Sequence, residues 1–287
     1  MAIAYDPPAH YEIKIWDVEY RKDAARPLLA RIYQPQGAGP FPALLDLHGG
    51  AWNDQDRTAN APMDERLAAS GILVAAIDLR RAHEAPYPAS VADVNYGVRW
   101  LKRKAAEWKG DATTLGALGS SSGGHELQLC AMRPRDPRYG AIPLVEAPRL
   151  DATLAYVIVR SPISDPLARY EQAKKMKREN LINASENYFR PWESIFEGNP
   201  QRILERGEAV ALPPMFVLQG ELDDNVLPAV QEKFVAAYRK TGGEIDYELF
   251  LGCEHRWVIH PGPQTDRAVE MVKAFIARQL RARQPLG

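Results

Sequence analysis

The hydrophobic and polar positions of the chain follow two alternating patterns. Short apolar runs, typical of strands buried on both faces of a sheet, are separated by segments in which apolar residues recur at helical spacing. The runs that predict buried strands are 43–47, 72–77, 114–118, 154–159 and 215–219, and 244–251 alternates as a last strand. The segments that predict helices are 64–70, 91–101, 127–131, 230–238 and 269–280. Strands that alternate with helices predict an α/β fold with a mainly parallel sheet covered on both faces.

Two parts of the chain depart from this alternation. Segments 11–18 and 28–33 predict an antiparallel hairpin at the edge of the sheet. The stretch 165–208 is polar and charge-balanced, carries scattered aromatic residues and is too long for a structureless loop. We interpret it as a helical cap inserted over the C-terminal edge of the sheet, with residues 1–164 and 209–287 as the core domain. The alternative is a set of surface helices far from any chemistry.

The run 114–118 leads directly into the sequence Gly119-Ser120-Ser121-Ser122-Gly123, and a helical segment follows. A G-x-S-x-G pattern between a strand and a helix predicts a nucleophile elbow, a sharp turn with the serine at its apex. The residues two before and two after the serine must be small, because a Cβ there would collide with the crossing backbone. Gly119 and Gly123 meet this requirement, so Ser121 is the candidate nucleophile.

A serine hydroxyl becomes nucleophilic only when a base removes its proton, and the base needs a carboxylate to orient it. Ligands collect beyond the carboxyl ends of parallel strands, so the acid and then the base should follow later strands. Asp223 follows the strand predicted at 215–219 and is the predicted acid. Its neighbour Asp224 is an alternative, and Glu221 is a weaker one.

His255 follows the last predicted strand, 244–251, and this place makes it the predicted base. His260 and His125 are the alternatives. His260 lies further along the same loop, whereas His125 lies one helical turn beyond Ser121, where its ring would point away from the hydroxyl. Three candidate side chains at successive strand ends, in the order that the chemistry requires, favour a triad over coincidence.

Acyl transfer also needs hydrogen-bond donors aimed at the developing oxyanion. The predicted strand 43–47 runs into His48-Gly49-Gly50-Ala51-Trp52, whose small residues let the backbone approach a substrate closely. We predict that the amides of Gly49, Gly50 and Ala51, together with that of Ser122, form this oxyanion hole. His48 is interpreted as a structural hydrogen-bonding residue.

Two tryptophans flank these predicted positions. Trp52 follows the glycine-rich loop and Trp257 follows the predicted base, so both are candidates for lining a substrate pocket, with simple packing as the alternative. Cys253, two residues before the base, is interpreted as a packed free thiol.

Taken together, these motifs resemble those of an α/β-hydrolase. The residues concerned are His48-Gly49-Gly50, Gly119-x-Ser121-x-Gly123, Gly220-x-x-Asp223 and His255, with Tyr87-Pro88-Ala89, Asp93 and Trp100-Leu101 as further matches. The chain is most similar to the esterase branch around hormone-sensitive-lipase-like and kynurenine-formamidase-like enzymes, over most of residues 40–280. The resemblance implies hydrolysis of an ester, or less often an amide or thioester, without a metal or organic cofactor.

The sequence departs from this branch in two places. Ala51-Trp52 stands where many members have a third glycine, which is closer to formamidase-like and feruloyl-esterase-like forms. Ser120 precedes the nucleophile where members often carry an acidic or bulkier residue. Both departures leave the substrate open.

Composition narrows the class of protein further. The chain has 287 residues, is 46% hydrophobic and has a formal net charge of -1. This balance gives no electrostatic footprint for nucleic acid or an anionic membrane. No apolar run reaches the roughly 18 residues that span a bilayer, and the N-terminus lacks the pattern of a secretory signal. Two cysteines are too few for a disulfide framework, so we expect a soluble protein of the reducing cytoplasm.

The sequence therefore predicts a carboxylesterase for small to medium ester substrates, in which Ser121 attacks the acyl carbon, His255 moves the proton and Asp223 orients the imidazole. An arylformamidase-like amide hydrolase is one alternative, and a non-catalytic hydrolase fold used for binding is another. Exposed strand edges would allow a homodimer.

Overall fold

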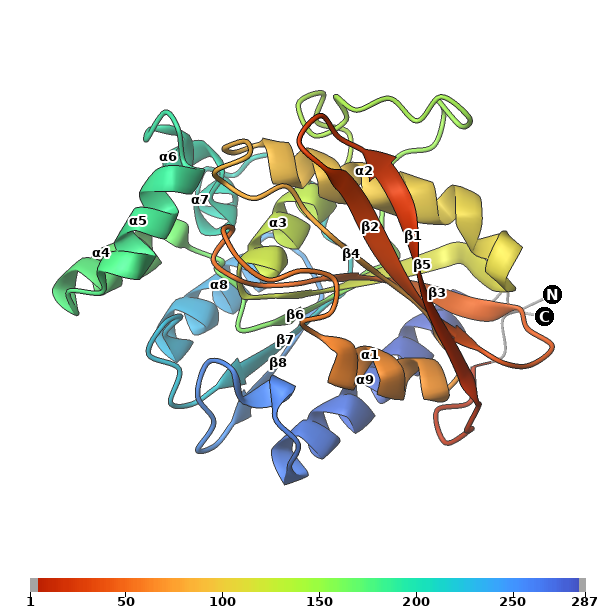
Figure 1. Cartoon of the computed structure of the whole chain (residues 1–287). Helices are drawn as coiled ribbons and strands as arrows, with labels where there is room; N and C mark the ends of the chain where they lie inside the picture. Colours follow the sequence, from red (N-terminus) through yellow and green to blue (C-terminus); the bar gives the residue numbers. More distant parts are fainter. Residues whose placement is uncertain (1–4, 284–287) are drawn as a thin grey trace.

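The computed structural model of the chain describes residues 5–283. Residues 1–4 lie outside this range. They are part of the N-terminal segment from which the absence of a secretory signal was predicted. Eight strands form one sheet in the order β1-β2-β4-β3-β5-β6-β7-β8. β1 pairs antiparallel with β2 and β2 antiparallel with β4, and every later pairing is parallel. Both the mainly parallel sheet and the antiparallel edge hairpin are thus confirmed (Figure 1).

The strands lie close to the predicted apolar runs. Their bounds are β1 Ile13–Lys22, β2 Pro27–Pro35, β3 Phe41–Leu47, β4 Leu73–Ile77, β5 Gly110–Ser120, β6 Tyr156–Arg160, β7 Met215–Gly220 and β8 Ile245–Phe250. β5 begins earlier than the apolar run because Gly110 and Asp111 pair with the start of β3. It also continues to Ser120, so the strand ends immediately before the candidate nucleophile.

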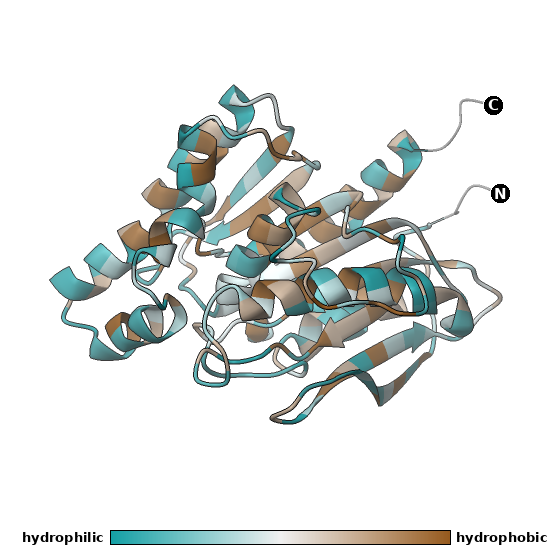
Figure 2. Cartoon of the chain, turned by 90° about the horizontal axis from the view of Figure 1, so that it is seen from above, coloured by the Kyte–Doolittle hydropathy of each residue, from teal (hydrophilic) through white to brown (hydrophobic). Residues whose placement is uncertain are grey.

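Helices cover both faces of the sheet. α2 (Ala89–Lys104), α3 (Ser121–Met132) and α8 (Pro228–Lys240) pack on one face, and α1 (Ala61–Ala69) and α9 (Pro263–Ala282) on the other. Successive strand residues point to opposite faces of the sheet. Leu45 of β3 therefore packs in the hydrophobic core under α2, α3 and α8, and Leu44 packs in the core under α1 and α9. Viewed from above, hydrophobic residues follow much of the strands, and the helices carry both hydrophobic and hydrophilic residues (Figure 2).

The segment predicted as a cap is helical. It contains α4 (Pro166–Lys175), α5 (Glu179–Tyr188), α6 (Ser194–Glu197) and α7 (Pro200–Glu205), which gather at one end of the sheet, at the left of Figure 1. Two short 3-10 turns, η1 (Ala105–Trp108) and η2 (Trp257–Ile259), complete the described structure. None of the helices within residues 5–283 combines the length and apolar character that crossing a bilayer requires.

Candidate active site

Ser121 occupies the strained turn that its motif predicts. β5 ends at Ser120, α3 begins at Ser121, and the backbone φ of Ser121 is +51°, a left-handed value that is uncommon for a residue with a side chain. A Cβ on Gly119 would lie 2.8 Å from the carbonyl oxygen of Gly123, and a Cβ on Gly123 would lie 2.2 Å from that of His48. Both positions therefore require glycine, as the motif predicts.

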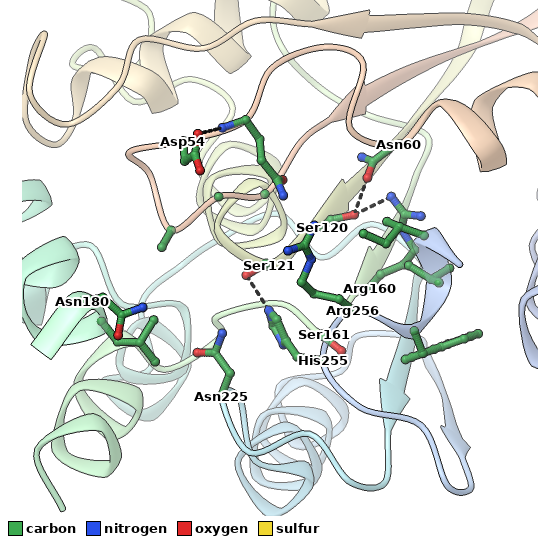
Figure 3. A pocket seen from close by; sticks show the side chains of 18 residues that line it. Asp54, Asn60, Ser120, Ser121, Arg160, Ser161, Asn180, Asn225, His255 and Arg256 are labelled. Carbon is green, nitrogen blue, oxygen red and sulfur yellow. Dashed lines mark hydrogen bonds between the residues drawn. The ribbon is translucent and has the colours of Figure 1, made fainter. Parts of the chain in front are cut away.

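The three predicted catalytic side chains meet at the carboxyl ends of β5, β7 and β8. Nε2 of His255 lies 3.0 Å from Oγ of Ser121, and its Nδ1 lies 2.8 Å from Oδ2 of Asp223. Figure 3 shows the His255 ring directed at the Ser121 hydroxyl from the loop after β8. The residues are far apart in sequence, and the parallel sheet brings the loops that carry them to one edge.

Asp223 is built to remain a carboxylate. Only 2% of its surface is exposed, and its Oδ1 accepts hydrogen bonds from the amides of Asn225 and Val226 at 3.0 and 2.8 Å. Burial acts to raise the pKa of Asp223, but the hydrogen bond and charge of His255 and the Val226 amide outweigh it, so the pKa falls below its ordinary value. An ionised Asp223 can only accept, so Nδ1 of His255 carries the proton and Nε2 is left free to accept one from Ser121.

The alternative acids have other partners. Asp224 is exposed and forms an ion pair with Arg178, and the Glu221 carboxylate accepts a hydrogen bond from the Gly252 amide. Neither has a hydrogen bond to His255 among the described residues.

The alternative bases lie elsewhere as well. His125 is buried, its Nδ1 accepts from Nε1 of Trp52 at 3.2 Å and its Nε2 lies 2.8 Å from the Gly198 carbonyl. Burial lowers the pKa of His125 to about 4, so its ring is neutral at physiological pH. His260 is exposed at the end of η2.

The glycine-rich loop adopts a tight left-handed conformation beside Ser121. The φ angles of Gly50, Ala51 and Trp52 are +101°, +50° and +63°. A Cβ on Gly50 would lie 2.1 Å from the Asp54 carbonyl, and one on Gly49 would lie 3.2 Å from Cβ of Ser121. Within residues 5–283, the amides of Gly50 and Ala51 donate no hydrogen bond. They are free donors close to the candidate nucleophile, and their predicted role at the oxyanion remains a prediction.

Ser122 and His48 complete the surroundings of this loop. Ser122 lies in the first turn of α3, where backbone amides have no helical acceptor, so its amide is also available. Nδ1 of His48 lies 2.8 Å from the Gly49 carbonyl, and burial lowers the pKa of His48. A neutral His48 that bonds the loop backbone agrees with its interpretation as a structural residue.

Ser121 and His255 open into a cavity of about 270 Å³. Its walls come from the glycine-rich loop, from the loop that carries His255 and from α5, which contributes Asn180 and Leu181. Part of the segment predicted as a cap therefore borders the site, although the domain boundaries themselves remain a prediction. Among the described residues, no group of three His, Cys, Asp or Glu side chains is placed to hold a metal ion.

The two tryptophans, predicted to line a pocket or simply to pack, lie in different surroundings. Trp257 lines the cavity and stacks on Phe250 with ring centroids 4.3 Å apart. Trp52 does not line it: only 4% of its surface is exposed, and it stacks on Tyr188 at 4.6 Å. The backbone of Trp52 is left-handed, and its indole packs between the hydrophobic core and Tyr188 of the inserted segment.

Sequence reasoning missed a buried polar network next to the nucleophile. Arg160, at the end of β6, donates to Oγ of Ser120, which donates to Oδ1 of Asn60 at 3.3 Å (Figure 3). Nδ2 of Asn60 in turn donates to Oδ2 of Asp46 at 2.8 Å. Burial lowers the pKa of Arg160 and raises that of Asp46, and each charge opposes the shift of the other. An arginine directly after the apolar run 154–159 was the available signal.

The chain matches known proteins over most of its length. The model of the BD-FAE family matches residues 31–237. A probable carboxylic ester hydrolase of Mycobacterium tuberculosis, LipM, is 26% identical over 251 residues, which are 83% of this chain and 54% of LipM. Esterase LipQ of the same organism is 24% identical over 279 residues, 94% of this chain and 63% of LipQ. The chain thus spans between about half and two thirds of the length of these relatives.

Solved structures share the fold. A truncated carbohydrate esterase from gut microbiota superposes with a TM-score of 0.77 at 18% identity, covering 97% of this chain and 100% of the other. Esterase 2 of Thermogutta terrifontis, phosphonylated by sarin, gives a TM-score of 0.74 at 22% identity, covering 95% and 96%. At such identities the likeness establishes the fold alone. The chain has the α/β-hydrolase fold and, from the match to 31–237, belongs to the BD-FAE family.

Proposed function

We propose that the protein is a serine hydrolase that cleaves small to medium carboxylic esters through an acyl-enzyme intermediate. One observation carries this proposal: a continuous line of hydrogen bonds joins Ser121 to His255 at 3.0 Å and His255 to Asp223 at 2.8 Å. The names of the relatives, a probable carboxylic ester hydrolase and an esterase, favour an ester over a formamide as the bond cleaved.

The reaction follows from the direction of these hydrogen bonds. Nε2 of His255 takes the proton of the Ser121 hydroxyl while Oγ attacks the acyl carbon, giving a tetrahedral intermediate. The same proton then passes from Nε2 to the alkoxy oxygen as the C–O bond breaks, and the alcohol leaves. Water, deprotonated by His255 in the same way, releases the acid from Ser121. Asp223 stays ionised throughout and stabilises the imidazolium.

The negative oxygen of the tetrahedral intermediate needs donors, and four amides are proposed for it. Those of Gly50, Ala51 and Ser122 would bind the oxyanion, with Gly49 in support, because they are free and border Ser121. The loss of one donor of this kind typically costs about 100- to 1000-fold in rate. The Gly50 carbonyl accepts hydrogen bonds from the amides of Asn53 and Asp54, both at 3.0 Å, and these bonds support the left-handed turn. The proposed donors would then need little reorganisation when substrate binds.

The cavity supports a substrate of limited size. Its volume of about 270 Å³ lies just below the range of roughly 300–1,000 Å³ typical of pockets for drug-sized ligands. Trp257 is proposed to contact the substrate, and the segment 165–208 is proposed to act as a cap over the site. A homodimer, a cytoplasmic location and the lack of a nucleic-acid partner remain predictions.

The test is turnover of p-nitrophenyl acetate and butyrate, beside N-formyl anilides as the amide arm. Ser121→Ala should abolish ester turnover and leave the melting temperature unchanged. Ser194→Ala is the matched control, since Ser194 lies on α6 and is absent from the cavity wall. Turnover by Ser121→Ala would refute the assignment, and faster cleavage of formyl anilides than of esters would favour the formamidase alternative. A wild-type protein inactive on both would favour the binding module.

A further inference from the structure

Arg169 is an unusual residue of the inserted segment. It lies on α4 with 3% of its surface exposed, and no carboxylate of the described residues lies within ion-pair distance of it. Its Nη1 and Nη2 atoms are buried without a hydrogen-bond partner in residues 5–283. A buried charge left in this state costs several kcal/mol, so the position calls for an explanation beyond stability.

The contacts that Arg169 does make lead to the catalytic acid. Its Nε donates to Oδ1 of Asn225 at 2.8 Å, and the Asn225 amide donates to Oδ1 of Asp223 at 3.0 Å. Its guanidinium also lies 5.5 Å from the centre of the Trp52 ring. The cationic Arg169 is therefore connected to the anionic Asp223 through two hydrogen bonds, with Asn225 between them.

The inserted segment contacts the loop after β7, which carries Asp223, at two neighbouring residues. Arg178, just before α5, forms an ion pair with Asp224, while Arg169 holds Asn225. The two contacts differ in environment: the Arg178 pair is exposed to solvent, where ion pairs contribute little, whereas Arg169 is buried. Arg178 is therefore a matched comparison for Arg169.

The charged groups that face Arg169 are few. Asp223 faces it from the loop after β7, and His125 faces it from α3. On its own helix, Asp165 caps the N-terminus and bonds Ala168 and Asn199 instead. Burial lowers the pKa of Arg169 to about 10, opposed by Asp223, so the guanidinium is charged at neutral pH. His255 in turn faces Asp223, Ser121 and its exposed neighbour Arg256.

We propose that Arg169 is a positioning residue for the reaction: it fixes the 223–225 loop through Asn225 and supplies a buried positive charge behind Asp223. The inserted segment thereby acts on the catalytic machinery as well as on substrate access. This inference rests on the proposed function. A cation near the Asp223–His255 pair opposes protonation of His255, so its removal moves the titration of His255 to higher pH.

The direct experiment is the titration of His255 followed by NMR in protein labelled at histidine nitrogen. We expect Arg169→Met and Arg169→Gln to raise the midpoint by at least ~0.5 pH unit relative to wild type. Arg169→Lys keeps the charge and should stay near the wild-type midpoint, as should Arg178→Met. An unchanged midpoint in folded Arg169→Met and Arg169→Gln would overturn the proposal. So would the failure of both neutral variants to fold, because Arg169 would then be a structural residue.

Kinetics give the second readout. The acid limb of kcat/KM for p-nitrophenyl butyrate should shift with the NMR midpoint, and kcat should fall ~10- to 100-fold in Arg169→Met with little change in KM. A loss of rate with the acid limb unmoved would indicate disturbed packing alone and contradict the proposal. The NMR titration does not require turnover, so an inactive wild type would remove the proposed function and still leave the electrostatic claim testable.

Discussion

Replacing Gly123 by alanine should disturb the geometry of the site without removing a reacting group. The new Cβ would lie 2.2 Å from the carbonyl oxygen of His48 and 2.8 Å from that of Leu47. Ordinary contact begins near 3.4 Å, so the His48 oxygen and the Cβ must separate by 3.4 − 2.2 = 1.2 Å. Both colliding atoms belong to backbone, which cannot rotate away as a flexible side chain can. The movement therefore separates the start of α3 from the glycine-rich loop.

The expected consequences follow from that displacement. Misplacing reacting groups by about 1 Å can cost ~100-fold in rate, so we expect kcat/KM of Gly123→Ala for p-nitrophenyl butyrate to fall by this order. Overpacking of this kind typically costs about 1–3 kcal/mol, so the melting temperature should fall by roughly 2–12 °C.

The matched control is Gly140→Ala. A Cβ at Gly140 meets only the Asp136 carbonyl, at 3.4 Å, and the residue lies on an exposed loop. Its activity and melting temperature should match those of the wild type. Gly123→Ala with activity within about threefold of wild type would refute the argument that this glycine sets the distance between nucleophile and loop.

Two further predictions concern buried carboxyl groups. Asp223→Asn should lower kcat by ~1,000- to 10,000-fold with the fold retained, because an amide no longer fixes the tautomer of His255; a p-nitrophenyl ester assay that finds a loss under tenfold would contradict this. Burial raises the pKa of Glu126 to about 8, so the folded protein keeps a proton that the unfolded chain releases above its ordinary pKa of 4.5. The free energy of unfolding should therefore fall by up to about 5 kcal/mol as pH rises from about 4.5 to 8. Urea unfolding of Glu126→Gln, whose side chain stays neutral, should not show this fall. Parallel pH profiles of the free energy of unfolding for the two proteins would contradict the prediction.

The sequence predicted the sheet because burial on two faces leaves a simple signal. Most strands from 41 to 220 contain a short apolar run bounded by polar turns, whereas β8 alternates. Chain order places Ser121 after β5, Asp223 after β7 and His255 after β8. The elbow was equally readable, because the space beside Gly119 and Gly123 excludes a side chain. These features depend on local backbone constraints and on chain order, both of which a sequence contains.

What the sequence did not predict depends on side-chain partners far away in the chain. Trp52 follows the glycine-rich loop, yet it packs on Tyr188 of the inserted segment, a partner that spacing cannot reveal. Arg169 sits in a polar segment like a surface residue, and only the fold shows that it is buried against Trp52 and Asn225. Polar residues of this kind carry no periodic signal, because their burial depends on the packing of several elements together.

The most direct test of the central claim is to identify the residue that an active-site reagent modifies. The intact protein would be treated with a fluorophosphonate, and its mass would be measured by mass spectrometry. Proteolytic digestion and peptide mass spectrometry would then locate the adduct. The account predicts a single adduct on Ser121 that disappears in Ser121→Ala and slows strongly in His255→Ala. An adduct on another serine, or no adduct in folded protein, would contradict it.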